Sequence, residues 1–417
     1  MSPDSFSIMD FEVRDLLWLL LPLAAASGWY AAHREKRRRL SASADSLSPE
    51  YFRGVNFLLN EQPDKAIEVF TQILEVNSET VETHLALGSL FRRRGEVERA
   101  IRIHQNLVAR PTLGKTQRAQ ALFELAQDYQ KAGLLDRAEQ LFLDLTDIPE
   151  YVEQALQALM HIYEQEREWD KAISTVRRMA TADDSNLQRL LAQYHCELGE
   201  DAWQAGSHVR AKKHVEKALK IDPGCVRANI LAGKILVNQG QDQQAIAVWK
   251  RIEQQDATYL DEVIDDIATA SRRLNDQQAF YNYLSDVIQR QPGLRTLRVY
   301  AEQIYLREGK MAAQEFVTSH LRQKPSVLGL KQLIDLQIAQ PEISDRENLD
   351  HIKVILDQLA AQQEGYQCQQ CGFHAQALHW QCPACHEWMT MQPAACSVSL
   401  GYIENRDVNT SKINDRN

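Results

Sequence analysis

The feature that most restricts the fold of this chain is a spacing that recurs eight times between Tyr51 and Pro325. A small residue, replaced by Met160 and Ile267 in two of the units, is followed twelve positions later by alanine and four positions after that by a bulky residue, as in Gly54, Ala66 and Phe70. The alanines of this frame are Ala66, Ala100, Ala138, Ala172, Ala211, Ala245, Ala279 and Ala313. Successive alanines are 34 residues apart, except for steps of 38 after Ala100 and 39 after Ala172. A 34-residue period is that of the tetratricopeptide repeat, whose unit is a helical hairpin.

The spacing has a physical reason. Two antiparallel helices that cross closely have room only for Gly or Ala at the crossing, while larger neighbours fill the groove beside it. Each hairpin leaves one apolar face uncovered, so successive hairpins stack. We therefore predict an all-α, superhelical solenoid of eight tetratricopeptide repeats over residues 51–325. The seventh unit, ATYLDEVIDDIATASRRL, is acidic at its start and departs most from the pattern.

Residues 326–363 predict a closing helix pair that gives the solenoid a polar end. No linker rich in Gly, Ser or Pro separates this pair from the cysteine-rich residues that follow. We therefore expect the cysteine-rich segment to dock on the final helices.

A repeat solenoid presents an extended surface and carries no built-in chemistry, so its usual function is to hold a protein or peptide partner. Counting from the small residues gives six candidate contacts on the inner face: Leu85, Ser89, Arg92, Phe123, Gln127 and Gln130. A solvated surface explains the same residues equally well. The apolar faces of the repeats could also bury a homodimer contact.

The N-terminus predicts a membrane anchor. Residues 16–32, LLWLLLPLAAASGWYAA, hold seventeen uncharged residues, at the short end of the roughly 17–25 that span a bilayer. A short segment, residues 1–15, precedes them, and a basic linker, residues 33–50, follows with Arg34, Lys36, Arg37, Arg38 and Arg39. Basic flanks stay cytoplasmic, which places the bulk of the chain on the cytoplasmic side of a single-pass protein. A cleaved signal peptide would carry its positive charge before the apolar stretch.

Four of the seven cysteines form two C-x2-C pairs, Cys368 with Cys371 and Cys382 with Cys385, ten residues apart. Two such turns facing each other supply four thiolates to one metal ion, so residues 364–393 predict a small metal-binding module. A pair of disulfides or a redox-active C-x2-C are the alternatives, but cytoplasmic topology and the absence of an adjoining βαβ pattern weigh against them. Iron and zinc both suit four sulfurs.

Little in the sequence indicates catalysis or nucleic-acid binding. The formal net charge is −10 and the pI near 5.7, and residues 366–393 contain no Lys or Arg, so no basic surface is available for phosphates. Nucleotide-binding, zinc-protease and hydrolase motifs are absent from the sequence, and a four-thiolate site leaves no open metal position. Residues 394–417 read as a flexible polar tail. An electron-carrier role for the module stays open as the alternative to a scaffold: a reversible iron couple would favour it, and redox-silent zinc would exclude it.

Three segments in one order, HREKRRR, YFRGVNFLLNEQPDKAIEVF and YQCQQCGFHAQALHWQCPACHEW, resemble the lipopolysaccharide assembly protein B family of Gram-negative bacteria. The resemblance implies a rubredoxin-like module in which Cys368, Cys371, Cys382 and Cys385 bind iron. It also implies a non-enzymatic adaptor of the inner membrane that regulates lipopolysaccharide synthesis. Its implied partners are the deacetylase that commits precursor to lipid A, the membrane protease FtsH that degrades this client, and another inner-membrane regulatory protein.

Overall fold

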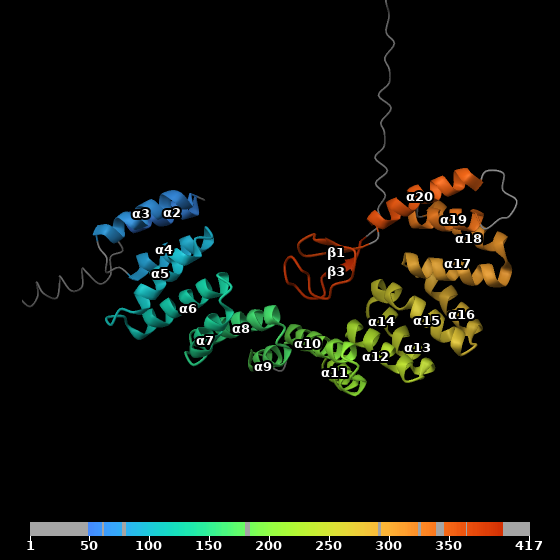
Figure 1. Cartoon of the computed structure of the whole chain (residues 1–417), viewed down its shortest axis with the longest axis horizontal. Helices are drawn as coiled ribbons and strands as arrows, with labels where there is room; N and C mark the ends of the chain where they lie inside the picture. The colour runs from blue at the N-terminus through green and yellow to red at the C-terminus, as the bar shows by residue number, and fades with distance from the viewer. Residues whose placement is uncertain are drawn as a thin grey trace, which may run out of the picture. The chain divides into compact units, whose positions relative to one another are not determined.

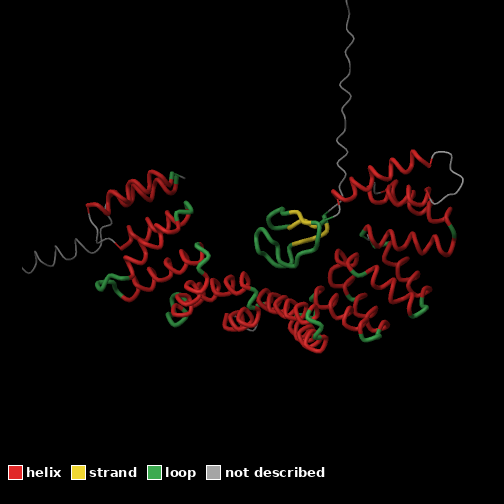
Figure 2. The backbone as a smooth tube through the Cα atoms, in the orientation of Figure 1, coloured by secondary structure: helices red, strands yellow, loops and turns green. Residues whose placement is uncertain are grey.

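The computed structural model describes residues 49–60, 62–76, 81–179, 184–290, 293–323, 327–338, 346–363 and 365–394. The predicted anchor, its basic flank and nearly all of the predicted tail lie outside these ranges. Within them, no helix combines the length and apolar character that a membrane crossing requires. The chain divides into two compact units, Met1–Ile162 and Tyr163–Asn417, which are described in turn (Figures 1 and 2).

The first unit consists of helices that follow one another as hairpins (Figure 1). They are α2 (Pro49–Leu59), α3 (Pro63–Val76), α4 (Val81–Arg93), α5 (Val97–Val108), α6 (Lys115–Lys131), α7 (Leu135–Leu145) and the start of α8 (Val152–Glu166). Within each hairpin the two helices pack at the small residue of the repeat. A Cβ atom added to Gly54 would lie 2.7 Å from the Phe70 ring, and one added to Gly88 would lie 2.3 Å from His104 Nε2. The contact predicted from the repeat spacing is therefore present.

The second unit continues the repeat pattern. Its helices are α9 (Trp169–Met179), α10 (Ser185–Gln204), α11 (His208–Ile221), α12 (Val226–Asn238), α13 (Asp242–Lys250), α14 (Ile252–Asp256), α15 (Ile264–Arg273), α16 (Gln277–Ile288), α17 (Leu294–Glu308) and α18 (Lys310–Gln323). Gly233 of α12 packs against Trp249 of α13, whose indole donates to the Ile230 carbonyl at 3.2 Å. Repeat hairpins over most of the described chain confirm the predicted tetratricopeptide solenoid.

The seventh repeat is irregular in structure as well as in sequence. Between α14 and α15 the chain forms a 3-10 helix, η1 (Ala257–Glu262). The Asp261 carboxylate accepts hydrogen bonds from the backbone amides of Arg295 and Thr296, both at 3.0 Å, and so caps the start of α17. This cap fixes η1 to the next repeat and leaves its neighbours Tyr259 and Glu262 available to another part of the chain.

The closing helices α19 (Val327–Ile338) and α20 (Arg346–Gln363) pack together, and the exposed surface of α20 mixes polar residues such as Asp350 with aliphatic ones. Val354 and Ile355 are each 56% exposed, and Ile352 and Leu359 are also exposed. Aliphatic residues occupy more of the circumference of α20 than contact with α19 covers, so part of its apolar surface faces outward.

The C-terminal module, residues 365–394, is a small β-structure. Its strands are β1 (Tyr366–Cys368), β2 (His374–Ala375) and β3 (Met391–Pro393). They form an antiparallel sheet in the order β2-β1-β3, with Cys368 opposite Met391. The sheet is too small to supply a core of its own, and its buried residues are Tyr366, Cys368, Cys382 and Met391. Such a module needs cross-linking by a metal or support from a larger surface.

Candidate metal centre and its contacts with the helices

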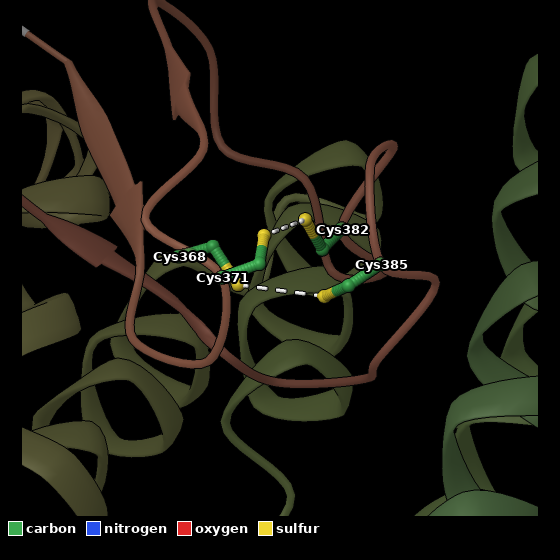
Figure 3. Close-up of side chains that lie close together, drawn as sticks. All are labelled: Cys368, Cys371, Cys382 and Cys385. Carbon is green, nitrogen blue, oxygen red and sulfur yellow. Dashed lines mark hydrogen bonds between the residues drawn. The ribbon is translucent and has the colours of Figure 1, made fainter. Parts of the chain in front are cut away.

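The four cysteines of the module converge on one point (Figure 3). Their sulfurs all lie within 4.8 Å of one another. The Sγ atoms of Cys371 and Cys382 are 3.7 Å apart, as are those of Cys368 and Cys385. Metal–sulfur bonds of about 2.3 Å in a tetrahedron place sulfurs about 3.8 Å apart. The donor set and its spacing therefore fit one tetrahedral metal ion.

Two turns of the same construction present these sulfurs. In the first, the Cys368 amide donates to the Phe373 carbonyl and the Gly372 amide donates to the Cys368 carbonyl. In the second, the Cys382 amide donates to the Glu387 carbonyl and the His386 amide donates to the Cys382 carbonyl. All four hydrogen bonds measure between 2.8 and 2.9 Å. Each turn ends on a left-handed residue, Gly372 at φ 77° and His386 at φ 61°. Glycine adopts this backbone readily, whereas His386 carries a Cβ atom there.

The thiols do not titrate alike. Burial disfavours the Cys368 thiolate, but hydrogen bonding with Thr390 and with the backbone at Cys371 and Gln370 outweighs burial and lowers the pKa of Cys368 to about 6. At Cys385 the Glu387 amide favours the thiolate, but desolvation and the neighbouring sulfurs raise the pKa to about 12. Four sulfurs this close can all be thiolates only beside a cation that offsets their mutual repulsion, as a bound metal ion does.

The module is attached to the helices through Trp388, which follows the second cysteine pair. Its indole Nε1 donates to Glu164 Oε1 at 2.8 Å, and the same oxygen accepts from the Tyr194 hydroxyl at 2.5 Å. The Trp388 ring meets Trp169 and Tyr194 edge-on, with centroids 6.1 and 5.7 Å away. Burial and then the charge of Glu164 raise the pKa of Tyr194 well above its usual value, so its hydroxyl stays a donor. We refer to these four residues as the Trp388 cluster.

A second contact joins the module to η1. The Tyr259 hydroxyl donates to the Met391 carbonyl at 2.8 Å, and the Tyr366 hydroxyl donates to Glu262. The Tyr259 ring also packs on Trp380 at 5.4 Å between centroids. The expectation that the module docks on the final helices was therefore wrong. The 18-residue helix α20 spans about 27 Å and allows the chain to return to the earlier repeats.

The six candidate inner-face contacts occupy different environments in the first unit. Leu85 is buried, with 7% exposed, in a core cluster with Leu107 and Ala121, which leaves it little surface for a partner. Phe123 packs against Phe142 and Tyr151.

The polar candidates form a network instead. Arg92 donates to Glu124, to Asp128 and to Gln127 at 2.6 to 2.8 Å, and Ser89 donates to Glu124 at 3.0 Å. Gln130 is half-buried on the same helix, α6. The network links α4 to α6, so these side chains already have a structural role.

Comparison with known proteins decides the family. The model of the rubredoxin metal binding domain matches residues 366–393, and tetratricopeptide repeat models match residues 83–120, 155–190 and 202–263. Lipopolysaccharide assembly protein B of Escherichia coli strain K12 is 35% identical over 380 residues, which cover 91% of this chain and 98% of that protein. The chain belongs to the lipopolysaccharide assembly protein B family. The protein of that name from Haemophilus influenzae is 34% identical over 391 residues, at the same coverage.

Among solved structures, the C-terminal part of a repeat-containing protein from Cytophaga hutchinsonii aligns with a TM-score of 0.39 and 12% identity. The alignment covers 68% of this chain and 99% of that one. Membership of the lipopolysaccharide assembly protein B family therefore rests on the sequence relatives, which extend over both the repeats and the module.

Sequence reasoning located the four cysteines but missed the residues that receive the module. Glu164, Trp169, Tyr194, Tyr259 and Glu262 lie on repeats that precede the module by at least 100 residues. One signal was present, because the irregular seventh unit contains Tyr259 and Glu262.

Proposed function

We propose that this protein is a non-enzymatic adaptor, anchored in the inner membrane with its repeats and module on the cytoplasmic side, that regulates lipopolysaccharide synthesis. It presents the deacetylase that commits precursor to lipid A to the membrane protease FtsH, and it responds to another inner-membrane regulatory protein. The observation that carries the proposal is family membership over 91% of the chain, with lipopolysaccharide assembly as the named role of the relatives.

The architecture supports an adaptor. Repeat solenoids bind proteins through extended surfaces, and the described residues place a folded module against those repeats through the Trp388 cluster and η1. We propose that the module binds one iron ion through Cys368, Cys371, Cys382 and Cys385, with zinc as the alternative. The metal would supply structural cross-linking, since four thiolates saturate a tetrahedral site.

A cross-linking pull-down from native inner membranes tests the proposal. The full-length chain is compared with a variant in which Cys368, Cys371, Cys382 and Cys385 are serine, and Cys396→Ser serves as the matched control because it removes a thiol outside the module. We expect the unaltered chain and the control to recover a membrane protease and a soluble lipid A enzyme, and the fourfold variant to recover less. Recovery of redox enzymes without either partner would contradict the adaptor.

A further inference from the structure

A cavity of about 280 Å³ lies where the module meets the second unit. Helices α10 and α12 and the 3-10 helix η1 form three of its sides. Leu378 and Trp380, from the loop between the two cysteine pairs, form the fourth. The cavity is therefore composite and exists in this form only while the module is docked on the helices.

Its walls combine aromatic surface with unused hydrogen-bond donors. Trp203 of α10 and Trp380 of the module both line the cavity, and neither indole N–H has an acceptor among the described residues. Lys234 of α12 also lines it, is exposed, and forms no hydrogen bond or ion pair within the same residues. The Asp266 carboxylate interacts with Lys234 through space.

The acidic groups of the cavity are already engaged. Arg227, 3% exposed, donates to both oxygens of Glu200 at 2.9 and 2.7 Å and to Glu197 at 2.8 Å. Glu262 accepts from the Tyr366 hydroxyl. The remaining guanidinium nitrogen of Arg227, Nη1, is buried without an acceptor in the described chain. The groups at this cavity that lack a partner in the described chain are therefore donors, and of these Arg227 Nη1 is buried, where a missing acceptor is costly.

The size of the cavity restricts what it can hold. Pockets for small molecules and cofactors measure about 300–1,000 Å³, so this cavity falls at the small end and suits a single amino-acid side chain with its apolar neighbours. A repeat solenoid binds polypeptides, which makes a partner protein the source of such a side chain.

We propose that this cavity binds an acidic side chain, Glu or Asp, of an extended segment of a partner protein. The carboxylate accepts from Lys234 and from the indoles of Trp203 and Trp380, and flanking apolar residues of the segment lie against Ile230 and Leu378. This site deepens the proposed function, on which it rests, because it gives the adaptor a binding pocket shared by repeats and module.

The test uses the full-length chain in detergent and three short peptides. The first is Ac-Ala-Leu-Glu-Leu-Ala-NH2, the second has Gln in place of Glu, and the third has the same Gln and a free carboxyl terminus. Binding is followed by the indole N–H NMR signals of Trp203 and Trp380, which are assigned with Trp→Phe variants. We expect the Glu peptide to shift both signals, and the Gln peptide to bind about tenfold more weakly because a charge-assisted hydrogen bond is lost.

Lys234→Met should weaken binding of the Glu peptide by a similar factor, whereas Lys220→Met, an exposed lysine of α11, should not. Thermal unfolding of both variants checks that they fold. Three results would overturn the proposal: equal binding of the Glu and Gln peptides, no shift with any peptide, or unchanged binding of the Glu peptide by Lys234→Met. Binding of the free-acid peptide alone would also overturn it, because the site would then recognise a chain terminus. The Lys234→Met variant is also used in the pull-down described above. If the peptides do not bind but this variant still recovers both partners, the binding site is wrong and the proposed function stands.

Discussion

Gly372 and His386 occupy the same position in the two cysteine turns, and both have a left-handed backbone. A Cβ added to Gly372 meets no atom within 4 Å, so Gly372→Ala changes only the backbone cost. That cost is about 1–2 kcal/mol for a residue with a Cβ. His386→Ala is the matched control, because His386 already carries that cost and its side chain is exposed. We expect Gly372→Ala to release metal faster to a chromogenic chelator and His386→Ala to behave like the unaltered protein. Equal release rates for the two variants would show that backbone strain in the turns does not control metal release.

The hairpin crossings give a second prediction for single residues. A Cβ at Gly233 would lie 2.1 Å from Trp249 Nε1, whereas one at Gly199 would lie 3.2 Å from a Leu231 methyl group. Gly233→Ala should lower the free energy of unfolding by about 1–3 kcal/mol, as overpacking does. Gly199→Ala should be nearly neutral, because alanine favours the helix by about 1 kcal/mol and the leucine can move. Urea unfolding of the two variants measures the difference, and equal losses would contradict the packing argument.

His195 links stability to pH. It is 3% exposed, and burial, followed by the charges of His214, Lys217 and Arg177, lowers its pKa to about 4. The unfolded chain, with a pKa near 6.5, takes up this proton first on acidification. The free energy of unfolding should therefore be highest above pH 6.5 and fall towards pH 4, by no more than about 3 kcal/mol. His195→Gln should reduce the slope in urea unfolding between pH 7 and pH 5, and an unchanged slope would assign the acid sensitivity to other groups.

Among the structural elements, the module depends on Trp388 for its position on α10. Trp388→Ala removes the ring contacts and the hydrogen bond to Glu164, and should cost about 2 kcal/mol or more as a central aromatic anchor. Trp388→Phe retains a ring and loses only the hydrogen bond, so its effect should be smaller. Hydrogen exchange should show lost protection in β1, β3 and the middle of α10. The loss should be larger for Trp388→Ala than for Trp388→Phe. Metal content should stay unchanged, and loss of metal would show that Trp388 supports the cysteine turns rather than docking.

The elements also show what the sequence could and could not predict. The hairpins were predictable because each crossing repeats one local spacing, and the cysteine turns because their ligands are close in sequence. The docking position was not predictable, since Trp388 and Glu164 are 224 residues apart and linker length limits only the distance the module can reach. The exposed aliphatic residues of α20 were not predictable for a related reason, because an aliphatic residue such as Val354 carries no sign of whether another element covers it.

At the scale of the whole molecule, the predicted anchor should be removable without unfolding the described helices. The first described helix begins at Pro49, so deletion of residues 1–33 removes the predicted span without entering it. We expect the shortened chain to leave the membrane fraction and to keep the helical circular dichroism of the remaining residues. If the proposed function is correct, regulation of lipopolysaccharide synthesis should weaken, because release from the membrane lowers the effective concentration of the chain near the proposed membrane partner.

An unrelated single-span segment of the same orientation, fused in place of residues 1–33, provides the control. It restores membrane concentration without restoring sequence-specific contacts of the span. Recovery of regulation by this fusion would assign the span to tethering alone, and failure to recover would assign it a specific contact with another membrane protein. Full regulation by the untethered chain would show that the predicted span is dispensable, because the solenoid would then reach its partners at bulk concentration.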